Sequence, residues 1–246
     1  MKALITGASS GIRRDFAKIL ASKGYDLVLV ARDEQRLKEL QKELKTDTKI
    51  ISMDLSNIEN CKKLHSENPD IDLLINNAGF GDCGNFTHTS LDKEISMINT
   101  NIVAYHILTK LYLIDMKKAN KGHILNVASI AGFMPGPLMS TYYATKSYVV
   151  RLSEGIREEL NKEKSNVKIS ILCPGPVKTN FTAVANVRFH IREANSYKVA
   201  KYAIDHLNSF YIVPGIDIKF AKLGAKLFPS SLVAKVTYMI QKKKLQ

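Results

Sequence analysis

The chain has 246 residues, of which 45% are hydrophobic, and its formal net charge at pH 7 is +13. This length suits one large α/β domain with a substantial core, so we expect residues 1–246 to form a single domain. Neither a membrane-spanning apolar run of 18 residues nor a signal-peptide pattern is present in the sequence. We therefore expect a soluble, cytoplasmic protein.

The positive charge is spread along the chain. In residues 32–45, RDEQRLKELQKELK, acidic residues alternate with basic ones, as on a solvated helix face. This pattern argues against a nucleic-acid partner. The one basic cluster, 241-QKKKLQ-246, follows apolar residues that include Val236 and Met239, which predicts a basic amphipathic helix over 228–246. We expect this helix to dock on its own domain or on a sister subunit rather than on a membrane.

Cysteines and histidines give no metal or disulfide pattern. Cys61, Cys83 and Cys173 are odd in number and far apart, which predicts reduced, buried thiols. The histidines, at positions 65, 88, 106, 123, 190 and 206, lack paired ligand spacing, so no metal site is predicted. Ser129 lacks the glycine-x-serine-x-glycine elbow of serine hydrolases.

Short aliphatic and β-branched runs alternate with amphipathic stretches along the chain. The predicted strands are 2–6, 26–31, 48–54, 71–77, 122–129, 167–174 and 210–213, and the predicted helices are 11–23, 33–45, 56–67, 90–119 and 140–164. This alternation is typical of βαβ units. We predict an α/β fold with a Rossmann-type, doubly wound parallel sheet of about seven strands and helices on both faces.

The first predicted strand runs into a glycine turn, 4-LITGASSGIRRDFAKIL-20. Gly7 ends the strand and Gly11 begins the helix, so backbone N–H groups can approach a pyrophosphate without an intervening Cβ. Ser9 and Ser10 add hydroxyls that can bond a phosphate or cap the helix. A purely structural turn between strand and helix is the alternative interpretation.

The end of the second predicted strand bears on the choice of cofactor. NAD-dependent enzymes place an acid there, whereas this chain has Ala31 followed by Arg32. A guanidinium can present a fork of donors to the 2′-phosphate of NADP. The alternative is a surface arginine paired with Asp33 or Glu34. After a nucleotide-like turn, this position favours NADP.

Together with motifs further along the chain, these features resemble the short-chain dehydrogenase/reductase family, in its compact single-domain branch. The motifs that carry the resemblance are 6-TGASSGI-12, 76-NNAG-79, Asn101 in 99-NTNIVA-104, Ser129 in 125-LNVASIAG-132, 142-YYATK-146 and 174-PGPVKT-179. They occur in the family's order and span residues 2 to 215. Jointly they are highly specific.

The resemblance implies an NADPH site. The residues it assigns to cofactor binding are Gly7, Ser9, Ser10, Gly11, Ile12, Arg32, Asp54, Leu55, Asn77, Ala78, Gly79, Tyr142, Lys146, Pro174, Gly175, Val177 and Thr179. In this assignment Asp54 and Leu55 flank the adenine, residues 76–79 support the sheet and the adenosine ribose, and residues 174–179 wrap the nicotinamide. A structural role for 76–79 is an alternative, because asparagines at strand ends often satisfy backbone groups.

Tyr142 and Lys146 stand four residues apart on a predicted helix and hence on one face. A nearby ammonium stabilises a phenolate, so we expect proton transfer by Tyr142 closer to neutral pH. Spacing alone also allows Tyr143, and the family pattern selects Tyr142. The resemblance assigns Ser129 to the substrate oxygen and Asn101 to a backbone contact with a water linked to Lys146. A locally satisfied polar residue is the alternative for Asn101.

Arg13 departs from the family pattern, in which a third glycine serves close helix–strand packing and cofactor approach. Its side chain can intrude on the pyrophosphate site, or it can swing outward and attract the phosphates alongside Arg14 and Arg32. The sequence does not choose between these two orientations. We expect Arg13 to modify cofactor affinity rather than abolish function.

The predicted function is an NADPH-dependent carbonyl reductase or alcohol dehydrogenase, with Tyr142 as the proton donor. A substrate with an apolar part is expected because the segment 180–200, where the family places its substrate loop, offers Phe181, Val184, Val187 and Phe189. The alternatives are a 3-oxoacyl thioester reductase and a cofactor-binding protein impaired by Arg13. The resemblance also implies a homodimer or homotetramer built through helices 90–119 and 140–164.

Overall fold

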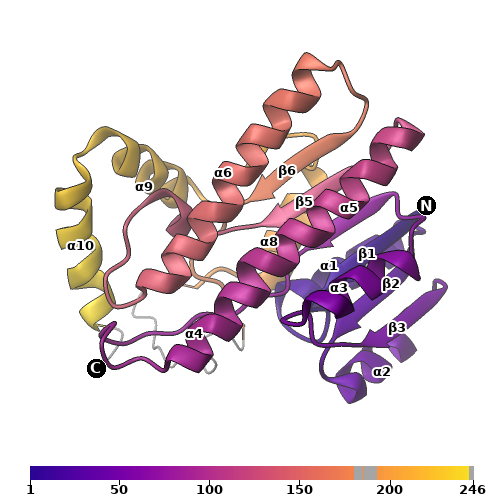
Figure 1. Cartoon of the computed structure of the whole chain (residues 1–246), viewed down its shortest axis with the longest axis horizontal. Coiled ribbons are helices and arrows are strands. Elements are labelled where there is room, and N and C mark those ends of the chain that lie inside the picture. The colour runs from indigo at the N-terminus through magenta and orange to yellow at the C-terminus, as the bar shows by residue number, and fades with distance from the viewer. Residues whose placement is uncertain (180–184, 186–192, 244–246) are drawn as a thin grey trace.

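A computed structural model describes residues 1–179, 185 and 193–243, in which helices flank a parallel sheet (Figure 1). The strand order is β3-β2-β1-β4-β5-β6-β7, and every neighbouring pair is parallel. The strands are β1 (Lys2–Thr6), β2 (Asp26–Ala31), β3 (Thr48–Ser52), β4 (Leu73–Asn76), β5 (His123–Val127), β6 (Lys168–Leu172) and β7 (Tyr211–Ile212). The predicted doubly wound sheet is confirmed.

Helices follow most strands. They are α1 (Ile12–Ser22), α2 (Glu34–Glu43), α3 (Ile58–Ser66), α4 (Leu91–Ile98), α5 (Ala104–Ala119), α6 (Ser140–Lys162), α8 (Ser196–Asp205), α9 (Ile216–Leu227) and α10 (Ser230–Lys242). Two shorter helical segments are η1 (Asn99–Val103), which is a π-helix, and η2 (Ile130–Phe133), which is a 3₁₀-helix. Side-chain caps fix several of the starts, as where Asn57 accepts a hydrogen bond from the backbone N–H of Glu59 at the start of α3.

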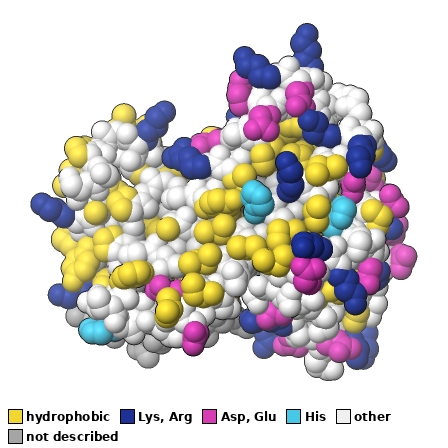
Figure 2. Space-filling model, in the orientation of Figure 1, with side chains coloured by type: hydrophobic (Ala, Val, Ile, Leu, Met, Phe, Trp, Pro, Cys, Tyr) yellow, Lys and Arg dark blue, Asp and Glu magenta, His cyan; other side chains and the backbone are white. Residues whose placement is uncertain are grey.

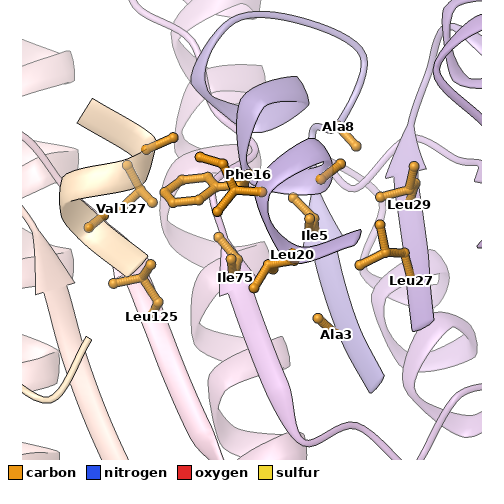
Figure 3. Close-up of a cluster of buried hydrophobic side chains, with 14 of the residues drawn as sticks. Ala3, Ile5, Ala8, Phe16, Leu20, Leu27, Leu29, Ile75, Leu125 and Val127 are labelled. Carbon is orange, nitrogen blue, oxygen red and sulfur yellow. The ribbon is translucent and has the colours of Figure 1, made fainter. Parts of the chain in front are cut away.

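Alternating residues of each strand supply two hydrophobic layers. Ala3 and Ile5 of β1 pack with residues of α1, α2 and α8, whereas Leu4 packs with residues of α3, α5 and α6. Figure 3 shows the first layer, where Phe16 of α1 lies against side chains of the sheet. A sheet covered on both faces needs nearly continuous apolar strands, so the strands could be predicted from aliphatic runs in the sequence.

The structure corrects several predicted boundaries. The strand predicted over 48–54 ends at Ser52, and the strand predicted over 71–77 covers only Leu73–Asn76. The helix predicted over 90–119 is interrupted by η1, whose π-helical turn has no signal in the hydrophobic pattern. Two helices, α8 and α9, were not predicted, and the first turn of α8 falls within the segment 180–200. Residues 180–184 and 186–192 of that segment lie outside the described residues.

The predicted C-terminal helix over 228–246 corresponds to α10, which begins at Ser230 and is described as far as Lys243. We expected it to dock on its own domain or on another subunit. It contacts its own domain through its buried residues Thr237 and Gln241, whereas the apolar Val236 and Met239 are exposed. In the described ranges, no helix combines the length and apolarity needed to cross a membrane. Cys61, Cys83 and Cys173 are buried, as predicted.

Candidate active site

A cleft of about 1020 Å³ lies where the strands of the sheet end at their carboxyl termini. Ligands of open α/β sheets bind at this edge. Every residue assigned above to cofactor binding lines the cleft, and so does Ser129. Asn101 is fully buried and does not line it. The sheet therefore brings together positions from one end of the chain to the other in one cavity.

The glycine turn between β1 and α1 forms one wall of the cleft. Gly7 and Gly11 have φ angles of 73° and 60°, a backbone region that L-amino acids with a Cβ rarely adopt. A Cβ at Gly11 would also lie 2.7 Å from Cγ2 of Thr179. Glycine at these two positions therefore allows the turn and brings the 174–179 loop close to the start of α1.

The loop after β4 is tied to the glycine turn. Oγ1 of Thr6 accepts hydrogen bonds from the backbone N–H groups of Asn77 and Ala78, both at 2.9 Å. Nδ2 of Asn77 is buried and has no hydrogen-bond partner among the residues that the structure describes. A buried donor without a partner at the wall of a cleft is suited to a ligand oxygen.

Two arginines line the end of the cleft beside β2. Arg32 follows the strand, and Arg36 lies in the first turn of α2. Asp33 caps α2 by accepting from the backbone N–H of Arg36 at 3.0 Å, and it also pairs with Nε of Arg36 at 3.2 Å. Glu34 pairs instead with Lys38 at 2.6 Å. The alternative of an Arg32 paired with Asp33 or Glu34 therefore has no ion pair to support it within the described chain.

Arg36 was not singled out in the sequence. The sequence contained the features needed to identify Arg36 as a residue of this site. It stands four residues after Arg32, and a helix N-cap at Asp33 places it in the first turn of the helix. The guanidiniums of Arg32 and Arg36 give this end of the cleft two positive charges. The charge of Arg36 is paired with the carboxylate of Asp33. Such a pair suits a phosphate group.

Arg13 points into the cleft. Its Nη2 donates a 2.7 Å hydrogen bond to the carbonyl oxygen of Gly79, so the side chain spans from α1 to the loop after β4. A Cβ at Gly7 would lie 2.9 Å from Cδ of Arg13, which shows how closely the side chain crosses the glycine turn. Burial lowers the pKa of Arg13, and the positive charge of Arg32 lowers it further. The alternative in which Arg13 swings outward is wrong for this structure, because Gly79 offers the guanidinium a carbonyl acceptor inside the cleft.

Ser129 and Tyr142 meet at the other end of the cleft. Ser129 lies just after β5 and Tyr142 in the first turn of α6, and a hydrogen bond between their side chains lowers the pKa of the tyrosine. Oγ of Ser129 also accepts from the backbone N–H of Ala131 at 3.2 Å. The Ser129 hydroxyl is thereby held beside the Tyr142 phenol.

Tyr143 has a different environment. Its hydroxyl accepts a hydrogen bond from Nε2 of Gln241, so it faces the C-terminal helix α10. The rings of Tyr142 and Tyr143 pack edge to face with centroids 6.1 Å apart. Both tyrosines line the cleft, and Tyr142 is the one bonded to Ser129.

Lys146 is buried at the end of the cleft that holds Ser129 and Tyr142, with an exposed fraction of 5%. Its Nζ donates to the carbonyl oxygen of Val127 at 3.0 Å and lies 5.4 Å from the centroid of the Tyr105 ring and 5.9 Å from that of Tyr142. Burial lowers the pKa of Lys146 to about 7, and the positive charge of Arg13 contributes to this shift. The ammonium therefore titrates near physiological pH.

The expected lowering of the Tyr142 pKa is wrong for this structure. Burial raises that pKa to about 12 and outweighs the opposing effects of the hydrogen bond with Ser129 and of the Arg13 charge. The physical reason is desolvation, since a phenolate loses more hydration on burial than its neighbours here restore. At neutral pH the Tyr142 hydroxyl is protonated and can donate a proton.

Asn101 lies behind the cleft wall in the π-helical segment η1. Its Oδ1 accepts from the backbone N–H of Phe80 at 3.1 Å, and its Nδ2 donates to the carbonyl oxygen of Phe80 at 2.9 Å and to Oγ1 of Thr145 at 3.1 Å. These partners are far away in the sequence, so the alternative of local satisfaction is wrong. The side chain clamps the loop after β4 to α6, the helix that carries Tyr142 and Lys146.

In the part of the chain that the structure describes, no group of three or more His, Cys, Asp or Glu side chains could hold a metal ion. The polar groups that line the cleft include hydroxyl, ammonium and guanidinium donors. Such a donor set can bind a phosphate-bearing cofactor at one end and polarise a carbonyl oxygen at the other.

Comparisons with known proteins agree with this arrangement. A family profile described as short chain dehydrogenase matches residues 1–188. An uncharacterized oxidoreductase of Staphylococcus epidermidis is 36% identical over 184 residues, which cover 73% of this chain and 79% of that protein.

Two solved structures also resemble the chain. A short-chain dehydrogenase from Sphingobium yanoikuyae in complex with NADPH is 27% identical, with a TM-score of 0.82 and 92% of each chain covered. A short-chain dehydrogenase/reductase from Burkholderia phymatum in complex with NAD is also 27% identical, with a TM-score of 0.82 and coverage of 90% of this chain and 91% of that one.

Proposed function

The chain belongs to the short-chain dehydrogenase family and is an oxidoreductase, and from that premise we propose that it reduces ketones or aldehydes with an apolar part, using NADPH. The observation that carries this proposal is the convergence of Ser129, Tyr142 and Lys146 at one end of a cleft whose other end has a glycine turn and two arginines. The reaction is reversible, so the same site oxidises the corresponding alcohol.

The residues of the cleft suit a nicotinamide dinucleotide over most of its length. The glycine turn, the unpartnered Nδ2 of Asn77 and the guanidiniums of Arg32 and Arg36 would hold phosphate and ribose groups. The positive pair beside β2 favours NADPH over NADH, because a 2′-phosphate carries charge that a ribose hydroxyl lacks. When bound, the reduced cofactor supplies the hydride.

The protein side chains supply the proton and orient the carbonyl. The Ser129 hydroxyl is placed to donate a hydrogen bond to the substrate oxygen, and the Tyr142 hydroxyl is placed to protonate that oxygen as it becomes an alkoxide. A pKa of about 12 keeps Tyr142 protonated until the alkoxide forms. Lys146, with a pKa of about 7, is able to return a proton toward the phenolate and to stabilise its charge.

The substrate end has apolar walls. Met139 lies before α6, and Ile218 and Ala221 of α9 and Ile240 of α10 also line the cleft. Apolar walls with a few convergent polar groups are typical of sites for hydrophobic small molecules. These residues support a carbonyl substrate with an apolar part. A 3-oxoacyl thioester fits the same description, and the substrate panel below includes one.

Arg13 favours a second candidate, a cofactor-binding protein with impaired affinity. The guanidinium that donates to Gly79 lies between the glycine turn and the catalytic end, so a dinucleotide bound along the whole cleft requires that side chain to move. The hydrogen bond to Gly79 must then be broken or replaced by bonds to the cofactor. The two candidates differ in whether the unaltered chain binds NADPH.

The experiment is a fluorescence titration of the purified protein with NADPH and NADH, followed by NADPH-oxidation assays on ketones, aldehydes and a 3-oxoacyl thioester. We expect NADPH to bind more tightly than NADH and at least one carbonyl compound to be reduced. Arg32→Asp should reverse the cofactor preference. An unchanged preference in this variant would refute the role of Arg32, and failure of the unaltered chain to bind NADPH would favour the impaired candidate.

A further inference from the structure

The helices α9 and α10 expose an unusual number of large apolar side chains. More than half of the exposed large hydrophobic residues of the described chain lie in this hairpin, namely Ile216, Phe220, Leu223, Leu227, Phe228, Leu232, Val236, Tyr238, Met239 and Ile240. The helix α9 has no buried residue at all. We call these ten residues the C-terminal face. A concentration of exposed apolar side chains of this kind marks an interaction site.

Polar side chains, rather than apolar ones, attach α10 to the rest of the protein. Oγ1 of Thr237 donates to the carbonyl oxygen of Pro135 at 2.8 Å, and Nε2 of Gln241 donates to the hydroxyl of Tyr143. Thr237 and Gln241 are the buried residues of this helix. The usual polarity of a surface helix is therefore largely inverted, because its buried residues are polar and apolar residues such as Leu232, Val236 and Met239 are exposed.

The charge around the C-terminal face is strongly positive. Exposed lysines at positions 219, 226, 235, 242 and 243 accompany it, and Asp217 is the one acidic residue in the sequence from 216 to 243. Figure 2 shows hydrophobic side chains gathered at the end of the molecule formed by α9 and α10, with Lys and Arg side chains at the margin. Apolar residues with a lysine margin match the surface of a bilayer that contains anionic lipids.

We propose that the C-terminal face docks on the surface of an anionic lipid bilayer, with α9 and α10 lying at the interface rather than crossing it. A second copy of the chain fits less well, because a two-fold contact would bring the same lysines of both copies together without acidic partners. Lipid headgroups provide the missing negative charge, and acyl chains accept the apolar side chains. This docking does not depend on the proposed reaction.

The position of the face adds a consequence that does rest on the proposed function. Ile218, Ala221 and Ile240 line the cleft, so the hairpin forms part of the wall at the substrate end. A bilayer held against the C-terminal face would lie beside the opening of the site. The substrate class is then a carbonyl compound that partitions into membranes.

The test is co-sedimentation of the full chain with vesicles of phosphatidylcholine alone and with vesicles of phosphatidylcholine and phosphatidylglycerol. We expect pelleting with the anionic vesicles, little with the neutral ones, and release by salt. Phe220→Glu combined with Met239→Glu should abolish pelleting. Lys226→Gln combined with Lys235→Gln should weaken it about 25-fold, taking about fivefold for each lysine near an anionic surface.

Matched controls separate this surface from general stickiness and from misfolding. Leu91→Glu replaces an equally exposed apolar residue of α4, and Lys118→Gln combined with Lys162→Gln removes two exposed lysines elsewhere. We expect these variants to pellet like the unaltered protein, and all variants to keep its circular dichroism spectrum. Failure of the unaltered protein to pellet with anionic vesicles, or equal pelleting of the glutamate variant, would overturn the proposal.

The molar mass in solution tests whether a second copy of the chain, rather than a bilayer, covers the C-terminal face. If Phe220→Glu combined with Met239→Glu dissociates an oligomer of the unaltered chain, the C-terminal face is an interface between copies and the proposal is overturned. An unchanged molar mass supports lipid docking. Neither readout requires cofactor or turnover, so failure of the proposed reductase activity leaves the result interpretable.

Discussion

The two ends of the cleft differ in how their side chains are arranged for the ligand that we propose. At the catalytic end, Ser129 bonds Tyr142, and Lys146 bonds the carbonyl of Val127. At the glycine turn, Gly7 and Gly11 have the backbone of a phosphate-binding turn, but Arg13 crosses that turn to reach Gly79. The contrast shows that the side chains at one end of a cleft can bond one another while a single side chain crosses the other end.

The catalytic end gives the largest expected effect. Tyr142→Phe removes the hydroxyl that we propose as the proton donor, and kcat should fall by about 10²- to 10⁴-fold. NADPH affinity should change little, because the phenyl ring keeps its packing. Steady-state kinetics on the best substrate of the panel measures both quantities.

Tyr143→Phe is the matched control for this variant. It removes a hydroxyl of the same chemistry one residue away, which bonds Gln241 instead of Ser129. Its kcat should stay within about threefold of the unaltered enzyme, well below the effect of a lost proton donor. Equal losses in the two variants would show that Tyr142 is not a distinct proton donor.

The next largest effect is expected at the glycine turn, where the substitution should produce a gain in NADPH affinity rather than a loss. Arg13→Gly frees the carbonyl of Gly79 and empties the path across the turn, so NADPH should bind about 10- to 100-fold more tightly, the equivalent of one charged hydrogen bond. Arg14→Gly tests the same change at the neighbouring, half-buried position, where Arg14 pairs with Glu43. Fluorescence titration compares the three proteins.

Weaker NADPH binding by Arg13→Gly than by the unaltered protein would reverse this interpretation. It would mean that the guanidinium turns toward the cofactor phosphates on binding. The difference between the two cleft ends would then disappear, because both would consist of residues that assist the ligand.

The protonation of Lys146 links the two ends of the cleft, because the charge of Arg13 at the glycine turn helps to lower the pKa of this lysine. Its pKa in the folded state is lowered from 10.5 to about 7, so above that pH the unfolded chain holds a proton that the native state has lost. The free energy of unfolding should therefore rise with pH, by about 2 kcal/mol between pH 7 and 9. Urea titrations should show this rise in the unaltered protein and not in Lys146→Met.

Arg13→Gly sharpens the same measurement, because the Arg13 charge helps to lower the pKa of Lys146. Its removal should move the pH-dependent rise in stability to higher pH. A rise at unchanged pH would indicate that burial alone sets the lysine pKa and that the two ends of the cleft are electrostatically independent.

The smallest expected effect concerns Arg36. Arg36→Gln should weaken NADPH binding about fivefold and leave NADH binding unchanged, since it removes one exposed cation near the expected 2′-phosphate. Asp33 still caps α2 through the backbone N–H of residue 36, so the helix is retained. Lys38→Gln, two residues along the same helix and paired with Glu34, is the control and should bind both cofactors as before.

Much of this molecule was predictable from the sequence because the relevant signals are local. Aliphatic runs such as 26–31 must form strands buried on both faces, and glycines at 7 and 11 predict a tight turn between strand and helix. The order of strands and turns then predicts which residues share the cleft. Boundaries were less accurate, and α8 and α9 were missed. For α9 the cause is its exposed face, since the apolar pattern of this helix does not mark a buried side.

The sequence by itself determined the fold class, the family motifs and the set of polar residues at the carboxyl edge of the sheet. Only the tertiary structure decided that Arg13 reaches Gly79, that Asn101 clamps Phe80 to Thr145, and that burial holds the Tyr142 pKa at about 12. These properties depend on desolvation and on partners tens of residues away in the chain. Periodicity and spacing report neighbours along the chain, whereas side-chain direction and desolvation are set by neighbours in space.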